Sequence, residues 1–205
     1  NIENGIPEID RLLKGDPICQ GTGTIWKKDS FVKIGGWDEN LALWQDVELH
    51  LRAQLKKCQY ELRFDLRPDV FIRISDQSLS RAGIYSYAKQ DSRVRVLMNS
   101  VSEMNQKSVM QQHLSAVSEL TRDLLFSSIK YRYFDLAGRL VRFSKEYRLI
   151  TKSALFGFRL FRLSEKYRLT RIPGVFSFFR NLLAFGKSNY RDSLGKVYYE
   201  GDLAI

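Results

Sequence analysis

A Gly-Gly pair at residues 35–36 separates two segments of different hydrophobic periodicity. Before it, residues 22–26 have the composition of a short β-strand, and residues 31–34 contain a small apolar patch. Residues 37–40, which follow it, have the composition of a tight turn. Over residues 44–57 the apolar side chains recur at the spacing of a helix. The stretch therefore predicts a strand, a turn and an amphipathic helix in this order.

Asp46 lies in the first turn of the predicted helix. A carboxylate at this position is stabilised by backbone N–H groups that have no partner in the helix, and by the helix dipole. Both interactions favour the ionised form, which can accept a proton. Asp46 is therefore a candidate general base. The alternative interpretation is an ordinary carboxylate near a helix N-terminus.

The order of residue types around the Gly-Gly pair is shared with a known group of enzymes. The matching residues are Ile25-Trp26-Lys27-Lys28, Phe31, Gly35-Gly36-Trp37-Asp38-Glu39, Gln45-Asp46 and Arg52-Ala53. They resemble the second half of the catalytic domain of family 2 glycosyltransferases, which have the GT-A fold. The resemblance extends over about 60 to 80 residues, and such an ordered set is more specific than one short motif. One position departs, because Gln45 stands where the family usually has Glu.

The resemblance implies an α/β fold. Residues 1–82 would form the C-terminal, acceptor-side half of a GT-A domain, and a mostly α-helical region would follow over residues 83–205. The implied reaction is inverting transfer of a sugar from a nucleotide-sugar donor to a saccharide or lipid-linked acceptor, with Asp46 as the general base. The implied setting is cell-envelope or surface polysaccharide synthesis, in the cytoplasm or at the inner face of the cell membrane.

The same resemblance suggests which residues contact the substrates. They are Thr22, Gly23, Lys28, Trp37, Asp38, Trp44, Gln45, Arg73, Ser78 and Arg81. Small residues such as Thr22 and Gly23 allow close approach of a ligand or of a neighbouring strand. The indoles of Trp37 and Trp44 offer flat faces for stacking on a sugar, or they pack in the core. Lys28 faces a diphosphate or lies in a solvated turn.

Family 2 enzymes hold Mg²⁺ or Mn²⁺ against the donor pyrophosphate with an Asp-x-Asp motif in their N-terminal half. This sequence contains no Asp-x-Asp, no Gly-rich phosphate loop and no Cys-x-x-Cys. A divalent metal is therefore expected for the complete enzyme, with ligands from a part that is absent here. We expect the chain to be a fragment of a longer protein and to be inactive by itself.

Charge divides the sequence into two parts. Residues 1–82 carry 12 Lys or Arg and 13 Asp or Glu, a net charge of −1, whereas residues 83–205 carry 21 and 10, a net charge of +11. This asymmetry predicts a domain boundary near residues 80–83. The second part contains no run of 18 uncharged apolar residues, so no transmembrane helix is predicted.

The basic part contains an internal repeat. Residues 139–149 (RLVRFSKEYRL) and 159–169 (RLFRLSEKYRL) are identical at seven of eleven positions. Each copy has an apolar face at helical spacing and basic residues on another face. The apolar positions are Leu136, Leu140, Phe143 and Tyr147 in the first copy, and Phe156, Leu160, Leu163 and Tyr167 in the second. Two similar basic amphipathic helices are therefore predicted, followed by a third, apolar helix after Pro173-Gly174.

Helices with Lys and Arg on one face and Phe, Leu and Tyr on another are typical of proteins that lie on anionic membranes. Residues 130–187 are the candidate membrane-binding region, and a helical bundle with a solvated basic surface is the alternative. Nucleic acid is not expected as a partner, because no known nucleic-acid-binding motif accompanies the positive charge. A second class of function therefore remains open, a non-catalytic helical module that binds a membrane or a protein and carries a degenerate transferase remnant.

Overall fold

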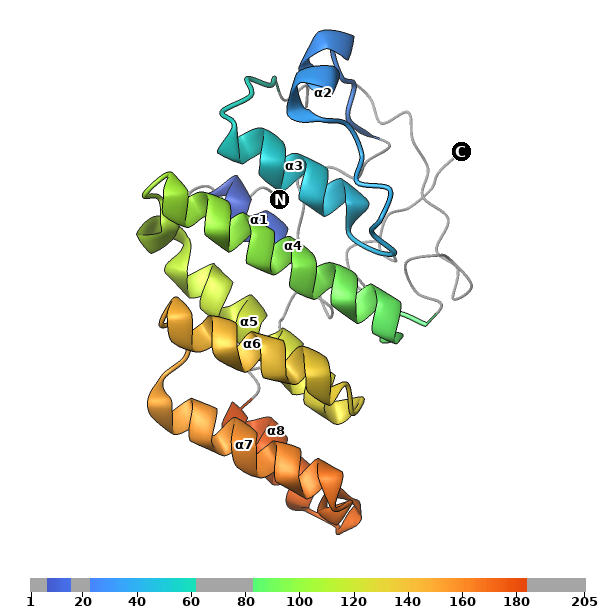
Figure 1. The fold of residues 1–205 in the computed structure, drawn as a ribbon, viewed down its shortest axis with the longest axis vertical. Coiled ribbons are helices and arrows are strands. Elements are labelled where there is room, and N and C mark those ends of the chain that lie inside the picture. Colours follow the sequence, from blue (N-terminus) through green and yellow to red (C-terminus); the bar gives the residue numbers. More distant parts are fainter. Residues whose placement is uncertain (1–6, 16–22, 62–82, 184–205) are drawn as a thin grey trace, which may run out of the picture.

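The computed structural model describes residues 7–15, 23–61 and 83–183, and these residues form helices and connections without a strand. The α-helices are α1 (Glu8–Leu13), α2 (Lys28–Ile34), α3 (Gln45–Leu55), α4 (Tyr87–Gln106), α5 (Leu114–Lys130), α6 (Phe134–Glu146), α7 (Lys152–Lys166) and α8 (Val175–Leu183). Two short 3₁₀ helices, η2 (Met110–His113) and η3 (Leu169–Arg171), precede α5 and follow α7. Figure 1 shows the helices stacked from α2 at one end to α7 and α8 at the other.

The prediction of an α/β fold is wrong for the described residues. Residues 24–27 have no regular secondary structure, and Ile25 is fully exposed. A strand needs a neighbour that accepts and donates its backbone hydrogen bonds, and none is present in the described part of the chain. The apolar patch that follows is α2 rather than part of a turn. Residues 70–74, whose composition is also typical of a β-strand, lie outside the described residues.

Helix α5 lies at the centre of the stack and is in contact with α1, α4, α6 and α7. Val117, Leu124 and Leu125 on this helix have no exposed surface. The core built around them is continuous from Leu12 in α1 to Leu183 in α8. A smaller cluster of Ile34, Leu49 and Ala53, with Trp26 and Phe31 packed against it, joins α2 to the other side of α3.

The acidic and basic parts of the sequence are in contact. Helix α3 packs against α4, and α1 packs against α5. His113 in η2 is buried, and its Nδ1 lies 2.7 Å from Asp10 Oδ1 in α1. The predicted boundary near residues 80–83 falls mostly in a range that is not described, so it stays a prediction.

The repeat forms two helices, α6 and α7, that end in the same way. Arg148 and Arg168 follow the two helices at equivalent positions, and both have left-handed backbone conformations, with φ of 54° and 60°. The environments of the two apolar faces differ. Leu136 and Leu140 of α6 have no exposed surface, whereas the equivalent Phe156 and Leu160 of α7 are 60% and 42% exposed. Helix α7 packs through its opposite side, which carries Leu155, Phe158 and Phe161.

Candidate functional site

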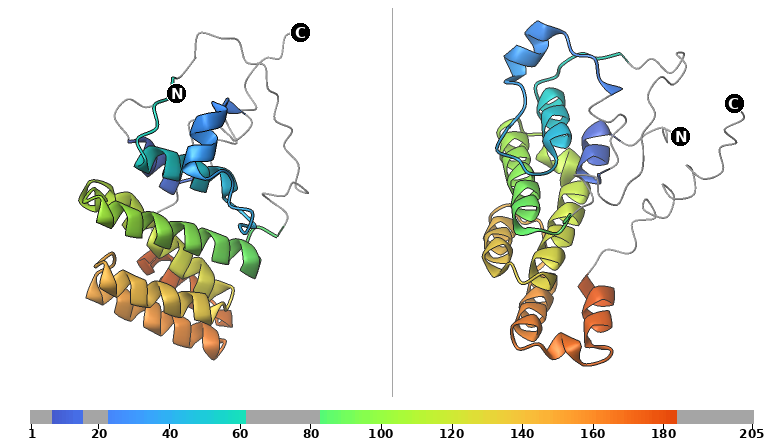
Figure 2. Two further views of the ribbon diagram at one scale, coloured as in Figure 1. Left: turned by 45° about the horizontal axis from the view of Figure 1, so that its top comes forward. Right: turned by 90° about the vertical axis from the view of Figure 1, so that its right-hand side faces the viewer.

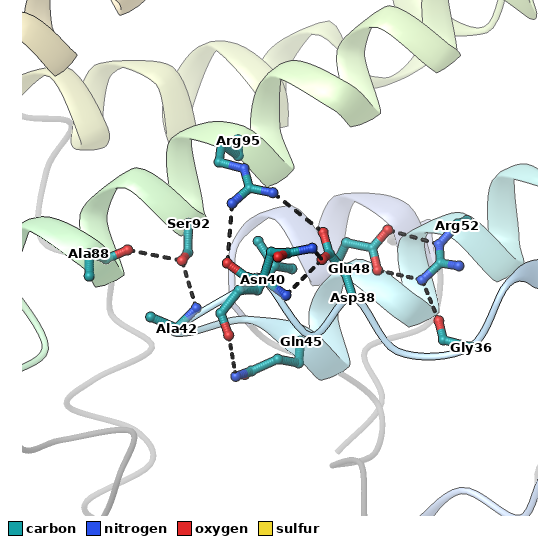
Figure 3. Close-up of polar contacts among 11 residues, drawn as sticks. Gly36, Asp38, Asn40, Ala42, Gln45, Glu48, Arg52, Ala88, Ser92 and Arg95 are labelled. Atoms are coloured by element: carbon teal, nitrogen blue, oxygen red, sulfur yellow. Dashed lines mark hydrogen bonds and ion pairs between the residues drawn. The ribbon is translucent and has the colours of Figure 1, made fainter.

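Arg52 joins the Gly-Gly turn to α3 (Figure 3). Its guanidinium donates hydrogen bonds of 2.6 Å to the carbonyl oxygens of Ile34 and Gly36, and it also binds both carboxylate oxygens of Glu48 at 2.6 and 2.8 Å. The two carbonyls lie where α2 ends, and such groups have no partner within their own helix. The planar guanidinium can reach all four oxygens because its donors point in fixed, divergent directions.

The same contact explains why a glycine stands at residue 35. Gly35 ends α2 with a φ of 101°, a conformation that side chains rarely adopt. A Cβ atom there would also lie 2.9 Å from Nη1 of Arg52. The Gly-Gly turn and the Arg52 side chain are therefore in direct contact in this chain. They correspond to the Gly-Gly and Arg-Ala elements of the sequence pattern described above.

Asp38 forms the turn that follows (Figure 3). Its Oδ1 accepts hydrogen bonds from the backbone N–H of Asn40 at 2.9 Å and from the Asn40 side-chain amide at 3.1 Å. Its Oδ2 lies 3.6 Å from Nη2 of Arg95 in α4. The backbone hydrogen bond is the main reason why the pKa of Asp38 is lowered, and the positive charge of Arg95 acts in the same direction. Asp38 thus connects the turn to the helical stack.

The two tryptophans of the predicted site lie in different surroundings. Trp37 is 43% exposed, and its ring contacts the edge of Phe31. Trp44 is half-buried, packs against the core and lies under the guanidinium of Arg93 in α4, 4.8 Å from the ring centre. The face of Trp37 is therefore accessible to a ligand, whereas one face of Trp44 is occupied. The Gln45 side chain is also occupied, because it donates a 2.7 Å hydrogen bond to the carbonyl of Leu41.

Asp46 is the second residue of α3, as the sequence predicts, and it is half-buried. Its Oδ1 accepts a 2.8 Å hydrogen bond from the N–H of Val47. The ion pairs recorded among the described residues involve other carboxylates. The Asp46 carboxylate is therefore held by the helix N-terminus rather than by a cation of the described chain.

His50 lies one turn after Asp46 and was not recognised from the sequence. It is buried, with 8% of its surface exposed, and its Nε2 lies 3.3 Å from Oγ1 of Thr24. The Trp26 ring packs edge-on against it, and the Trp26 indole nitrogen is buried without a hydrogen-bond partner among the described residues. The signal that could have identified His50 is its spacing of four from Asp46, which places both on one side of a helix.

Burial lowers the pKa of His50, and the negative charges of Asp46 and Glu8 partly oppose this effect. His50 is therefore neutral at neutral pH. A neutral imidazole does not form a salt bridge with a carboxylate, so His50 does not pair with Asp46 as a cation. Glu8 reaches this side of α3 from α1, where its Oε2 accepts a 2.6 Å hydrogen bond from the Gln54 amide.

The other predicted site residues in the described part of the chain, Lys28 and Gly23, do not join this group. Lys28 is exposed at the start of α2, and Gly23 is exposed in the segment before it. Thr22, Arg73, Ser78 and Arg81 lie outside the described residues. The structure therefore brings Thr24, Trp26, Asp46 and His50 together, while Asp38 and Trp44 contact α4.

The described residues do not fit the expected divalent metal. Across residues 7–15, 23–61 and 83–183, no group of three His, Cys, Asp or Glu side chains has the arrangement of a metal site. The negative charges of Asp46 and Glu8 both act on His50, but these three side chains are not arranged as a metal site. No catalytic step through a metal is therefore derived from these residues.

Comparisons of the chain with protein-family models, with curated proteins and with solved structures yield no match. The likeness to family 2 glycosyltransferases therefore rests on the order of residues in residues 25–53.

Proposed function

We propose that the chain takes part in the transfer of a sugar from a nucleotide-sugar to a hydroxyl group, and that Asp46 is the general base. The observation that carries this proposal is the position of Asp46, a half-buried carboxylate at the start of α3, one turn before the buried His50. A general base must be ionised and must reach the proton that it removes. A location in the cytoplasm, at the inner face of a membrane, belongs to the same proposal.

In the proposed reaction, the acceptor hydroxyl transfers its proton to the Asp46 carboxylate. The acceptor oxygen forms a bond to the anomeric carbon of the donor on the face opposite the diphosphate. The bond between that carbon and the diphosphate oxygen breaks, and its electron pair leaves with the nucleoside diphosphate. One displacement inverts the configuration at the anomeric carbon.

The surrounding side chains support this role by position and polarity. The Thr24 hydroxyl provides a hydrogen-bonding group at His50, one turn from the base, and the Trp26 ring packs against the same histidine. The exposed ring of Trp37 offers a flat apolar face for stacking on an acceptor sugar. Arg52 holds the turn that precedes Trp37 against the same helix that carries Asp46, so the turn and the base belong to one rigid unit.

The test compares Asp46→Asn with a matched control. Asp29 is the second residue of α2, as Asp46 is of α3, but Asp29 is exposed. Asp29→Asn therefore removes the same charge from the same helical position outside the proposed site. The purified full-length protein, including the expected donor-binding half, is incubated with UDP-glucose, UDP-N-acetylglucosamine, GDP-mannose and dTDP-rhamnose, and the release of nucleoside diphosphate is measured.

We expect Asp46→Asn to lower the release by at least about a hundredfold, which is the usual contribution of a general base. We expect Asp29→Asn to retain the rate of the unmodified protein. Equal rates in the two variants would remove Asp46 from the role of base. Absence of release by the unmodified protein with all four donors would overturn the proposed reaction for this chain.

A further inference from the structure

Helix α7 carries a row of exposed apolar side chains on the side that faces away from the helical stack. Phe156, Leu160, Leu163 and Tyr167 are 60%, 42%, 49% and 65% exposed. Their spacing of four, three and four places them within about 60° of one another around the helix axis. Because Leu155, Phe158 and Phe161 bury the opposite side, α7 has one apolar face in the core and a second in solvent.

Helix α8 extends this surface at the end of the molecule. Phe178 and Leu182 are 60% and 58% exposed, while their neighbours Phe179 and Leu183 are buried. Leu182 and Leu183 lie close to Gly157 of α7. A Cβ atom built on that glycine would be 2.7 Å from Cδ2 of Leu183 and 3.9 Å from Cδ2 of Leu182. Figures 1 and 2 show α7 and α8 side by side as the last layer of the stack. The docking face is defined here as Phe156, Leu160, Leu163, Tyr167, Phe178 and Leu182.

The docking face lies in a strongly positive part of the chain. Residues 151–183 contain seven Lys or Arg and one Glu, a net charge of +6. Arg159, Arg162 and Lys166 are exposed and fall on one flank of the apolar row of α7. Apolar side chains with a basic flank match the boundary between acyl chains and anionic headgroups of a bilayer.

The same flank borders a mostly apolar cavity that three arginines help to line. The cavity has a volume of about 290 Å³, lies between α5, α6 and α7, and is lined by Arg142, Arg159 and Arg162 together with apolar side chains. Guanidinium groups bind phosphate oxygens through paired hydrogen bonds. Phosphate groups at a membrane surface would therefore find donors beside the apolar row.

We propose that the docking face binds the surface of an anionic phospholipid bilayer, with α7 and α8 lying in the interface. Within the part of the chain that the structure describes, no helix combines the length and hydrophobicity needed to cross a bilayer. A second copy of the chain is a poorer occupant, because two copies of the segment 151–183, each with a net charge of +6, would repel each other. The proposal is independent of the sugar transfer proposed above.

The experiment measures flotation of the full chain with vesicles of phosphatidylcholine, with and without phosphatidylglycerol. The apolar variant is Leu160→Gln with Leu163→Gln, and the charge variant is Arg159→Gln with Lys166→Gln. Val32→Gln is the matched control, because Val32 is an apolar residue of α2 that is 66% exposed and lies at the other end of the stack.

We expect the unmodified chain and the Val32 variant to bind only the vesicles that contain phosphatidylglycerol. We expect the apolar variant to bind at least about tenfold more weakly, and the charge variant to lose about fivefold for each charge removed and to become less sensitive to salt. All variants should keep the thermal stability and the mass of the unmodified chain.

Three results would overturn the proposal. The first is equal binding to both kinds of vesicle, or no binding. The second is a clear loss of thermal stability in the apolar variant, which would mean that another part of the chain covers the face. The third is a concentration-dependent doubling of mass that the apolar variant abolishes, which would assign the face to a second copy.

Discussion

Single side chains account for most of the sequence pattern around the Gly-Gly pair. Arg52 binds the carbonyls at the end of α2, and Asp38 closes the next turn and reaches Arg95. These roles need no substrate, so the pattern is explained in part by local structure. Asp46 and His50 are different. They lie one turn apart on α3, and His50 contacts Thr24, but neither forms an ion pair between two helices.

His50 makes stability depend on pH. Burial lowers its pKa below the ordinary value of 6.5, so the unfolded chain binds a proton more readily than the folded chain. The contribution of neutral His50 is fully present above pH 6.5 and is lost as the pH falls toward the lowered pKa. We expect the free energy of unfolding in urea to decrease over that range. The His50→Gln variant should show a flatter dependence of the free energy of unfolding on pH. An unchanged slope in that variant would mean that other groups cause the dependence. His113→Gln, which replaces the other histidine of the chain, is the control.

Helices α6 and α7 show that similar elements can be used differently. They share a repeat and a left-handed residue after the last turn, yet the equivalent apolar face is buried in α6 and exposed in α7. The difference arises because α6 lies beside both α4 and α5, whereas α7 lies beside α5 and α8 at the end of the stack. The neighbours of each helix therefore decide which of its apolar residues contribute to the core.

The equivalent leucines of the repeat provide a matched pair of substitutions. Leu140 has no exposed surface, and Leu160 is 42% exposed. We expect Leu140→Ala to lower the free energy of unfolding by about 2–5 kcal/mol, because it leaves a cavity in a packed core. We expect Leu160→Ala to change it by less than about 0.5 kcal/mol, as for most surface substitutions. Urea denaturation followed by circular dichroism measures both, and similar losses would show that the α7 face is covered in solution.

At the scale of the whole molecule, the acidic and basic parts of the sequence are joined by one core. The buried residues run from Leu12 to Leu183 without a break, and α1 and α3 pack on α5 and α4. The small cluster under α2 lies on the far side of α3 from this core. Charge changes sharply along the sequence, but the packing of the described helices does not follow that change.

The continuous core predicts that both parts unfold together. All three tryptophans, Trp26, Trp37 and Trp44, precede residue 83, so tryptophan fluorescence reports on the first part and on the contact of Trp44 with α4. Circular dichroism is dominated by helices α4 to α8. We expect the two signals to give coincident transitions in urea, as for one cooperative unit. Separate midpoints would instead support two domains divided near residues 80–83.

The sequence by itself determined the features that depend only on residues close to one another along the chain. The helix that carries Asp46, the turn at the Gly-Gly pair and the two helices of the repeat were all predicted, because helical periodicity and glycine conformation act over a few residues. Only the tertiary structure decided which partners these elements meet. Residues 22–26 have strand-like composition, but a strand forms only beside another strand, and none accompanies the described part of the segment.

The neighbours of the candidate site and of the docking face are also decided by the tertiary structure rather than by the sequence pattern. His50 is informative because it is buried next to Asp46, Thr24 and Trp26, and burial depends on contacts between distant residues. The apolar face of α7 has the same pattern as that of α6, so periodicity alone leaves open whether such a face packs in a core or lies on a membrane. The α7 face is exposed because α7 packs against its neighbours through the opposite side. A sequence pattern shows which faces of a helix are apolar, but it does not show which elements pack against them.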